Sequence, residues 1–387
     1  MPDPPSSSQG VHSIWLKRYA TVTGTPGIVV PRIWLKSPVW IAGVDVIQYF
    51  GRMYVRARDL DGAEGWSQCG PRLRRLVPVI LEDVIPFFLG KDARDIEVLL
   101  RNCYVSNENY RNAGHGFWNC LGAVELALWD LMARRAKLPV WKLLGTPLRK
   151  KIPVCLSRHA RSNEVEDELD IVQQSADLTG VTAVKLAVGG RMSQNIDTSP
   201  GRSEKLIRSA CERFAGSKEI YPDADGSFDV EGAVLMGRYL ESYGISWFEE
   251  PVPWEDFEAC GEVASQLDIP IAVGEEISSL PMFAWYARHH GATVLQPDVQ
   301  INGGLVRCLT VAKIAESCGL RFAPVGGSGM RLWPAVHLAA VVPNLARHIE
   351  VEFDMAIKNG VVEVPEGLGW GVEVDPEIAR SGEFLRV

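Results

Sequence analysis

Short apolar runs alternate with amphipathic stretches along the second half of the chain. The runs cover residues 152–156, 183–188, 219–223, 245–249, 269–275, 293–298, 320–325 and 348–353. Runs that are apolar almost throughout are typical of parallel strands with both faces buried, and the stretches between them have helical periodicity. Eight such units in about 200 residues predict an α/β barrel of the (β/α)8 type.

The first third of the chain has a mixed pattern. Residues 43–58 alternate apolar and polar side chains, which predicts a strand, and Asp59 and Gly62 mark a hairpin turn after it. Residues 72–100 and 118–144 have helical periodicity. This combination predicts an α+β domain in front of the barrel.

These patterns divide the chain into four parts. We expect a Pro/Ser-rich flexible tail over 1–12 and an N-terminal α+β domain over 13–148. The barrel is expected over 149–355. The last segment, 356–387, is expected to return to the N-terminal domain.

The composition narrows the function classes. The 387 residues are 47% hydrophobic and 23% charged, with a formal net charge of −8. This balance argues against a disordered chain and against a basic protein that binds nucleic acid. No charge-free apolar run approaches the roughly 18 residues of a transmembrane helix, so we expect no membrane partner. The Cys residues lack metal-type spacing and the first residues lack a secretion signal, which favours buried thiols in the cytoplasm.

Acidic residues stand at the ends of three consecutive predicted strands. The spacing from Asp223 to Glu249 equals that from Glu249 to Glu275, which is one strand–helix unit. Barrel enzymes carry their reactive groups at this rim. Three carboxylates side by side would repel one another without a bound cation, and an all-oxygen ligand set favours Mg²⁺. The alternative, that the acids cap the following helices, is less favoured for three successive strands.

A series of motifs resembles the enolase superfamily, in the mandelate racemase/muconate lactonizing group. The motifs are 54–66, 122–130, 138–145, Val184-Lys185, 222–225, 248–251, 273–275 and 296–304. Their order and spacing, rather than any single motif, carry the resemblance, which spans about residues 43–370. It implies a (β/α)7β barrel under an α+β capping domain that the C-terminal segment completes. It also implies that Asp223, Glu249 and Glu275 bind Mg²⁺.

The resemblance implies a reaction as well. The substrate would be a small-molecule carboxylate that loses its α-proton to a Lys or His, and the metal would stabilise the enediolate that results. Loss of a β-hydroxyl would then convert an acid sugar to a 2-keto-3-deoxy acid. Return of the proton on the other face would give a racemase or epimerase. A homo-oligomer is common among such proteins.

The second predicted strand departs from the family pattern. It commonly reads Lys-x-Lys with the second lysine as base, whereas this chain reads Lys185-Leu186-Ala187. Strand alternation puts Lys185 and Ala187 on the same face. Lys185 is therefore a candidate base. Alternatively, it holds the substrate carboxylate or one of the metal-binding side chains, or it forms an ion pair with Asp223.

The seventh predicted strand departs too. Residues 323–330 contain no His, although mandelate racemase-like members place one there, oriented by the acid of the sixth strand. That acid is Asp298 here. It is either a relict or the partner of another cation such as Lys185. The missing His weakens a racemase mechanism that needs a base on each face.

Other residues at the rim are candidates for the missing roles. Arg158 and His159 follow the first strand and could bind a polyhydroxy acid or supply a proton, although a solvated loop is an equal alternative. Asp225 is a candidate acid or a support for the metal ligands. Arg331 could clamp a carboxylate, and Glu350 is a candidate for substrate binding or an ion pair.

The segment 13–36 is a further candidate for substrate contact, because a loop of the capping domain closes over the substrate in this family. Three functions remain open. The favoured one is an Mg²⁺-dependent acid-sugar dehydratase, since one base–acid arrangement suffices. The others are a racemase, epimerase or cycloisomerase, and a degenerate barrel that binds a metal and an acid without turnover.

Overall fold

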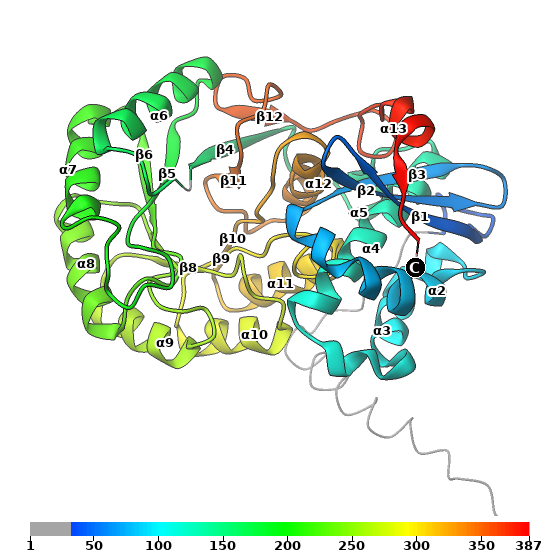
Figure 1. Cartoon of the computed structure of the whole chain (residues 1–387), viewed down its shortest axis with the longest axis horizontal. Helices are drawn as coiled ribbons and strands as arrows, with labels where there is room; N and C mark the ends of the chain where they lie inside the picture. Colours follow the sequence, from blue (N-terminus) through cyan, green and yellow to red (C-terminus); the bar gives the residue numbers. More distant parts are fainter. Residues whose placement is uncertain (1–31, 159, 387) are drawn as a thin grey trace, which may run out of the picture.

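The structure is a computed structural model that describes residues 32–158 and 160–386. Over these ranges the chain forms a barrel of parallel strands with a smaller α+β domain beside it (Figure 1). The predicted fold class is confirmed, because the capping domain, the barrel and the contribution of the C-terminal segment to the cap are all present. No helix in these ranges is long and apolar enough to cross a membrane.

The barrel strands form where the sequence has its apolar runs. They are β4 (Lys151–Arg158), β5 (Ala183–Ala187), β6 (Glu219–Asp223), β7 (Phe248–Glu249), β8 (Ile271–Val273), β9 (Val294–Leu295), β10 (Arg321–Phe322) and β11 (Ile349–Val351). Neighbours along the chain pair in sequence from β4 to β10, and β11 pairs with β4. Gly326 N donates a hydrogen bond to Glu350 O at 3.0 Å, which links the ends of β10 and β11.

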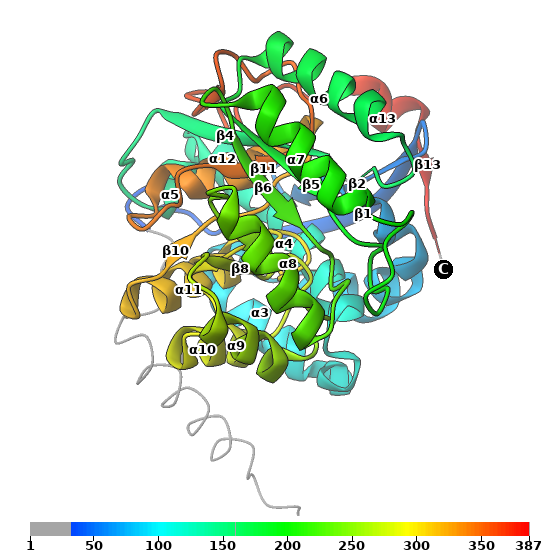
Figure 2. The ribbon, with the colours of Figure 1, turned by 90° about the vertical axis from the view of Figure 1, so that its left-hand side faces the viewer.

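Helices between the strands cover the outside of the barrel. They are α6 (Val165–Thr179), α7 (Arg202–Phe214), α8 (Val230–Ser242), α9 (Phe257–Gln266), α10 (Leu280–His289), α11 (Leu305–Ser317) and α12 (Leu332–Val341). Figure 2 shows α6, α7 and α8 in front of β5 and β6. Each helix packs an apolar face on the sheet, as Leu206, Ile207 and Ala210 do in α7.

The capping domain is an antiparallel sheet of order β13-β1-β2-β3 packed on a long helix. Its elements are β1 (Ile41–Tyr49), β2 (Arg52–Asp59), β3 (Glu64–Cys69), β13 (Glu383–Phe384), α2 (Ile85–Phe88), α3 (Ile96–Val105), α4 (His115–Ala136) and α5 (Val140–Leu144). Strand β3 lies so close to α4 that a Cβ at Gly65 would come within 2.1 Å of Leu131 N. Only glycine permits this packing.

The stretch 72–100 is helical but broken, in contrast to the single periodic pattern of the sequence. It contains a 3-10 helix over Pro71–Leu76 and a π-helical turn over Val79–Val84 before α2. Pro78 and Pro86 explain the breaks, because proline removes a hydrogen-bond donor and clashes with the preceding turn of a regular helix.

The C-terminal segment connects the two domains. Strand β12 (Val361–Glu363) pairs antiparallel with β4 of the barrel, and β13 pairs with β1 of the cap. Between them, α13 (Pro376–Ser381) packs Ile378 on Ile47 and Tyr54 of the capping sheet (Figure 1).

Glu125 of α4 joins the domains from a fully buried position. Its carboxylate accepts the backbone N–H groups of Leu305 and Val306 at 3.0 Å, in the first turn of α11, and Nε1 of Trp129 at 2.7 Å. Burial raises the pKa of Glu125 to about 7, although the three donors act in the opposite direction. A side chain of the cap therefore caps a barrel helix.

Candidate active site

Three carboxylates meet where neighbouring barrel strands end. Asp223 and Glu249 are the last residues of β6 and β7 and pair in register, and Glu275 follows β8. Each offers an oxygen, and the three atoms lie within 4.8 Å of one another. Carboxylate oxygens so placed are the ligands that Mg²⁺ and similar hard cations take. This group, called the triad below, therefore fits the expected metal.

Lys185 of β5 lies among the triad carboxylates. Its Nζ is 3.0 Å from Asp223 Oδ2, 2.9 Å from Glu249 Oε1 and 3.4 Å from Glu275 Oε2. A fourth carboxylate, Glu350 of β11, places Oε2 2.6 Å from the same nitrogen. The ion pair with Asp223 that the sequence suggested is thus one of four.

The charge of the cluster determines the state of this lysine. Burial by itself would lower the pKa of Lys185, but the surrounding carboxylates outweigh it and hold that pKa well above the usual value. Burial raises the pKa of Glu249, and the neighbouring acids add to the effect, while Lys185 opposes it. The carboxylates therefore favour the ammonium form of Lys185, which donates hydrogen bonds to Glu249 and Glu275.

Two other side chains lie beside the triad, those of Ala187 and Gln296. The register of β5 and β6 places Ala187 opposite Asp223, so the strand position that carries the family's second lysine presents only a methyl group to the triad. Gln296, after β9, donates from Nε2 to Glu249 Oε2 at 3.2 Å. Sequence reasoning missed this contact, although Gln296 lies in one of the motifs that carried the resemblance.

Asp298, after β9, pairs with Arg331 and not with Lys185. Arg331 Nη2 lies 4.0 Å from Asp298 Oδ2, whereas the Lys185 ammonium is held by four other carboxylates. Burial raises the pKa of Asp298, and the charge of Arg331 opposes the rise. Arg331 comes from the loop after β10, directly beyond residues 323–330, which contain no His.

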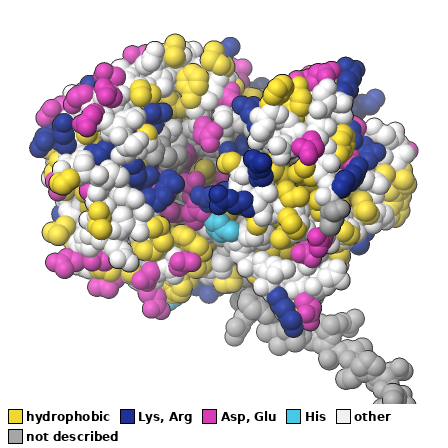
Figure 3. Space-filling view, in the orientation of Figure 1, with side chains coloured by type: hydrophobic (Ala, Val, Ile, Leu, Met, Phe, Trp, Pro, Cys, Tyr) yellow, Lys and Arg dark blue, Asp and Glu magenta, His cyan; other side chains and the backbone are white. Residues whose placement is uncertain are grey.

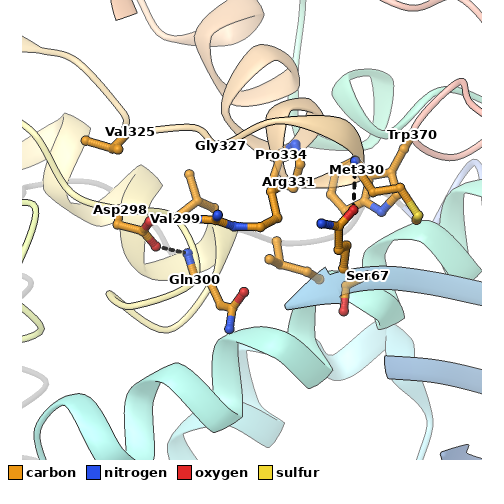
Figure 4. A pocket seen from close by; sticks show the side chains of 12 residues that line it. Ser67, Asp298, Val299, Gln300, Val325, Gly327, Met330, Arg331, Pro334 and Trp370 are labelled. Atoms are coloured by element: carbon orange, nitrogen blue, oxygen red, sulfur yellow. Dashed lines mark hydrogen bonds and ion pairs between the residues drawn. The ribbon is translucent and has the colours of Figure 1, made fainter. Parts of the chain in front are cut away.

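A small cavity lies between this ion pair and the capping domain. Its volume is about 20 Å³, room for about one water molecule. Ser67 of β3 lines one side and Val325 lines the barrel side. Figure 4 shows Arg331 extending from the side of Met330 toward Asp298. Arg331 therefore lies where the cap meets the barrel, with its side chain 22% exposed.

Asp225 forms a separate ion-pair cluster beside the triad. Its Oδ2 is 2.5 Å from Arg161 Nη2 and 3.1 Å from Arg191 Nη2. Its backbone N–H donates to Asp223 Oδ1 at 2.9 Å. Asp225 thus connects loops after β4, β5 and β6, and its backbone orients a triad carboxylate.

Two candidates from the first barrel strand are placed differently. Arg158 at the end of β4 points to α6, where Nε lies 2.9 Å from Oε1 of the buried Glu168. His159 lies outside the described residues, as do 13–31 of the candidate segment 13–36. Arg32, the first described residue of that segment, pairs with Asp95 of the cap at 2.5 Å.

The capping domain reaches the rim at Glu276, beside the triad. Arg72 donates from Nη1 to both oxygens of Glu276 at 2.8 Å, and His115, the first residue of α4, lies 3.5 Å from Oε2. The His115 ring also stacks on Trp254. Figure 3 shows acidic and basic side chains gathered in the hollow between the two domains. No pattern in the sequence indicated these contacts, because they depend on how the cap docks.

Family models match most of the chain. Residues 28–145 match the N-terminal domain of mandelate racemase / muconate lactonizing enzymes, and residues 168–378 match the enolase C-terminal domain-like family. The chain belongs to the mandelate racemase/muconate lactonizing group of the enolase superfamily. This confirms the resemblance that the motifs indicated.

Individual relatives of the group differ in their reactions. The chain is 26% identical to an arabinonate dehydratase of Saccharolobus solfataricus, over 86% of this chain and 90% of that protein. It is also 26% identical to a chloromuconate cycloisomerase of Pseudomonas putida, over 86% and 91%. A mandelate racemase/muconate lactonizing protein of Paracoccus denitrificans, in complex with magnesium, matches with a TM-score of 0.82, 25% identity, and 90% and 99% coverage. The relatives are thus enzymes, both lyases and isomerases.

Proposed function

We propose that the protein removes the α-proton of a small carboxylic acid in an Mg²⁺-dependent reaction, and that this reaction is the dehydration of an acid sugar to a 2-keto-3-deoxy acid. The observation that carries the proposal is the contact of Lys185 with all three triad carboxylates. The magnesium complex of a similar protein and the named dehydratase support it.

Each candidate residue has a role in this proposal. A divalent cation held by Asp223, Glu249 and Glu275 supplies positive charge for the substrate carboxylate, whose negative charge grows as the proton leaves. Lys185 would take the proton as its neutral amine, a form that a cation at the triad favours because like charges repel. It is the candidate because, among the described residues, it is the Lys or His that forms ion pairs with the triad. Glu350 positions the Lys185 ammonium.

The remaining candidates surround the substrate. Arg331, fixed by Asp298, holds a substrate oxygen with its planar guanidinium. Asp225 supports the metal ligands through the hydrogen bond to Asp223. Arg158 and His159 stay candidates for contacts with the hydroxyl groups of the substrate.

Dehydration is favoured over racemisation because Arg331, the cation beside Asp298, cannot act as a second proton acceptor. Racemisation needs a proton-transfer group on each face of the substrate, and the side chain that pairs with Asp298 is Arg331 and not a His. A guanidinium stays protonated at neutral pH and accepts no proton. Racemisation, epimerisation or cycloisomerisation is the alternative, which the named cycloisomerase supports.

Incubation with an acid-sugar and amino-acid-derivative library in D₂O with Mg²⁺, followed by mass spectrometry, tests the proposal. Loss of water from one compound supports the dehydratase and identifies its substrate. Deuterium uptake without water loss replaces it with the isomerase. If Mg²⁺ binds and every compound stays unchanged, both are rejected for these substrates in favour of the non-catalytic barrel. Lys185→Met should abolish whichever change is seen.

Two further proposals concern the state of the protein. We propose a cytoplasmic location, which is supported by the eight cysteines: all of them lie in the described part of the chain and are free thiols. We also propose a homo-oligomer, because this is common in the group. Light scattering on the eluted protein tests it, and a monomeric mass would reject it.

A further inference from the structure

Lys185 and a metal ion would draw on the same oxygen atoms. The ammonium contacts Asp223, Glu249 and Glu275, and these are the residues whose carboxylates converge as a metal-binding group. The lysine side chain is 1% exposed, so water does not screen its charge from the triad. Two cations held by one set of buried carboxylates repel each other strongly.

We propose that Lys185 is a tethered cation that competes with the divalent metal for the triad and thereby sets how tightly the protein holds that metal. The inference rests on the proposed function, since it takes the triad as the metal site. It goes beyond that function because it assigns Lys185 an effect on metal affinity that is separate from proton transfer.

Glu350 strengthens the competition. It lies outside the group of converging metal ligands, and its Oε2 is the carboxylate oxygen nearest to the ammonium, at 2.6 Å. Glu350 therefore keeps Lys185 beside the triad even when the triad oxygens bind a metal ion. Without this contact the Lys185 side chain could turn away from the triad, and its effect on metal affinity would then be small.

The same contacts make the fold tolerant of metal removal. Four carboxylates from four strands converge here, and buried acids of like charge destabilise a fold unless a cation offsets them. Lys185 supplies that cation from within the chain. The protein should therefore stay folded in a chelator, and a variant without the ammonium should depend on added metal.

Calorimetric titration with MgCl₂ and with MnCl₂ tests the inference directly. Lys185→Met keeps an unbranched apolar side chain but removes the ammonium and its charge. The variant should bind both ions at least about tenfold more tightly. The control is Lys151→Met. Lys151 is the first residue of β4, at the end of that strand away from the triad, and it is 65% exposed. Equal or weaker binding by Lys185→Met would overturn the inference.

Thermal unfolding gives a second readout that requires no activity. Excess MgCl₂ should raise the Tm of Lys185→Met more than that of the unchanged protein, and EDTA should lower it more. If Lys185→Met alone does not fold, Glu350→Gln is compared with Glu350→Gln/Lys185→Met, which restores the charge balance. The double variant should bind metal more tightly than the single one, and the reverse order would reject competition.

The outcomes separate this inference from the proposed function. Metal binding by Lys185→Met but not by the unchanged protein would support the competition and reject an Mg²⁺-dependent enzyme. Metal binding by the unchanged protein without a gain in the variant would reject only the competition. An absence of binding in both would reject both.

Discussion

Arg331 and Asp298 come from neighbouring barrel loops and meet beneath the capping sheet, with Nη2 of the arginine 4.0 Å from Oδ2 of the aspartate. The other oxygen of Asp298 accepts the backbone N–H groups of Gln300 and Ile301 at 2.8 and 2.7 Å. The carboxylate is therefore held by its own loop through one oxygen and contacts Arg331 through the other. Asp298 thus pairs with a cation that does not give up its proton at neutral pH.

Arg331→Met should raise the KM for the substrate about tenfold or more and change kcat less, because it removes a contact that is made before and during the reaction. Arg331→Lys should lie between, since lysine keeps the charge but not the planar fork. Steady-state kinetics with the substrate from the library measures both variants. An unchanged KM would remove Arg331 from the substrate site.

Glu249→Gln should abolish metal binding and turnover, since it replaces a charged ligand of the triad by a neutral amide. Calorimetric titration with Mg²⁺ and the product assay measure the two effects. Glu250→Gln is the matched control. It makes the same change at the neighbouring residue, whose carboxylate is not in the triad, so metal binding should be retained. Burial raises the pKa of Glu250 well above its usual value, and nearby acids including Asp223 add to this. Retained turnover in Glu249→Gln would contradict the metal assignment.

Glu125→Ala should lower the free energy of unfolding by roughly 3 kcal/mol or more, because three buried N–H donors lose their acceptor. Urea unfolding measures the change. Glu108→Ala, at a position 58% exposed in the cap, should change stability by only a few tenths of a kcal/mol. Similar losses in the two variants would show that Glu125 does not hold the domains together.

His337 of α12 should make the fold sensitive to mild acid. Its Nδ1 accepts the N–H of Trp141 at 3.0 Å, so Nε2 carries the proton toward Trp370 O at 3.1 Å. Burial lowers the pKa of His337 from 6.5 to about 4, although the hydrogen bond to Trp370 opposes the shift. Below pH 6.5 the unfolded chain takes up a proton that the folded chain refuses, so stability falls as the pH drops toward 4.

The expected loss is on the order of 2 kcal/mol between about pH 6.5 and about pH 5. Urea unfolding at both values measures it. His337→Asn keeps an acceptor for Trp141 and does not titrate, so its stability should fall less over the same interval. Parallel pH profiles for the two proteins would exclude His337 as the source.

The sequence predicted the barrel and the triad for physical reasons that act locally. A strand buried on both faces must be apolar throughout, so each of the eight runs could be read without knowing its neighbours. The acids Asp223 and Glu249 end such runs, and parallel strands bring their carboxyl ends to one rim. The equal spacing of Asp223, Glu249 and Glu275 along the sequence therefore corresponds to carboxylates that lie close together in the fold.

The ion pair of Lys185 with Asp223 was among the predicted alternatives. Other partners of the rim acids could not be predicted, because they depend on the docking of distant segments. Asp298 was expected to be either a relict or the partner of another cation such as Lys185. Arg331 reaches it from the next loop, while four carboxylates hold the lysine. Arg72 and His115 meet Glu276 from the other domain. Periodicity reports which face of an element is buried and carries no information about such pairs.

The path of the C-terminal segment bears on the order in which the molecule can be assembled during synthesis. Strand β13 is an edge of the capping sheet, and β12 lies on the first strand of the barrel, yet both are synthesised after all eight parallel strands of the barrel. The other strands of the cap precede the barrel in the sequence, so their sheet has one edge unpaired and Ile47 uncovered until α13 and β13 have been synthesised. Release of the chain before β13 would therefore leave the cap incomplete, although most of the cap is made before the barrel.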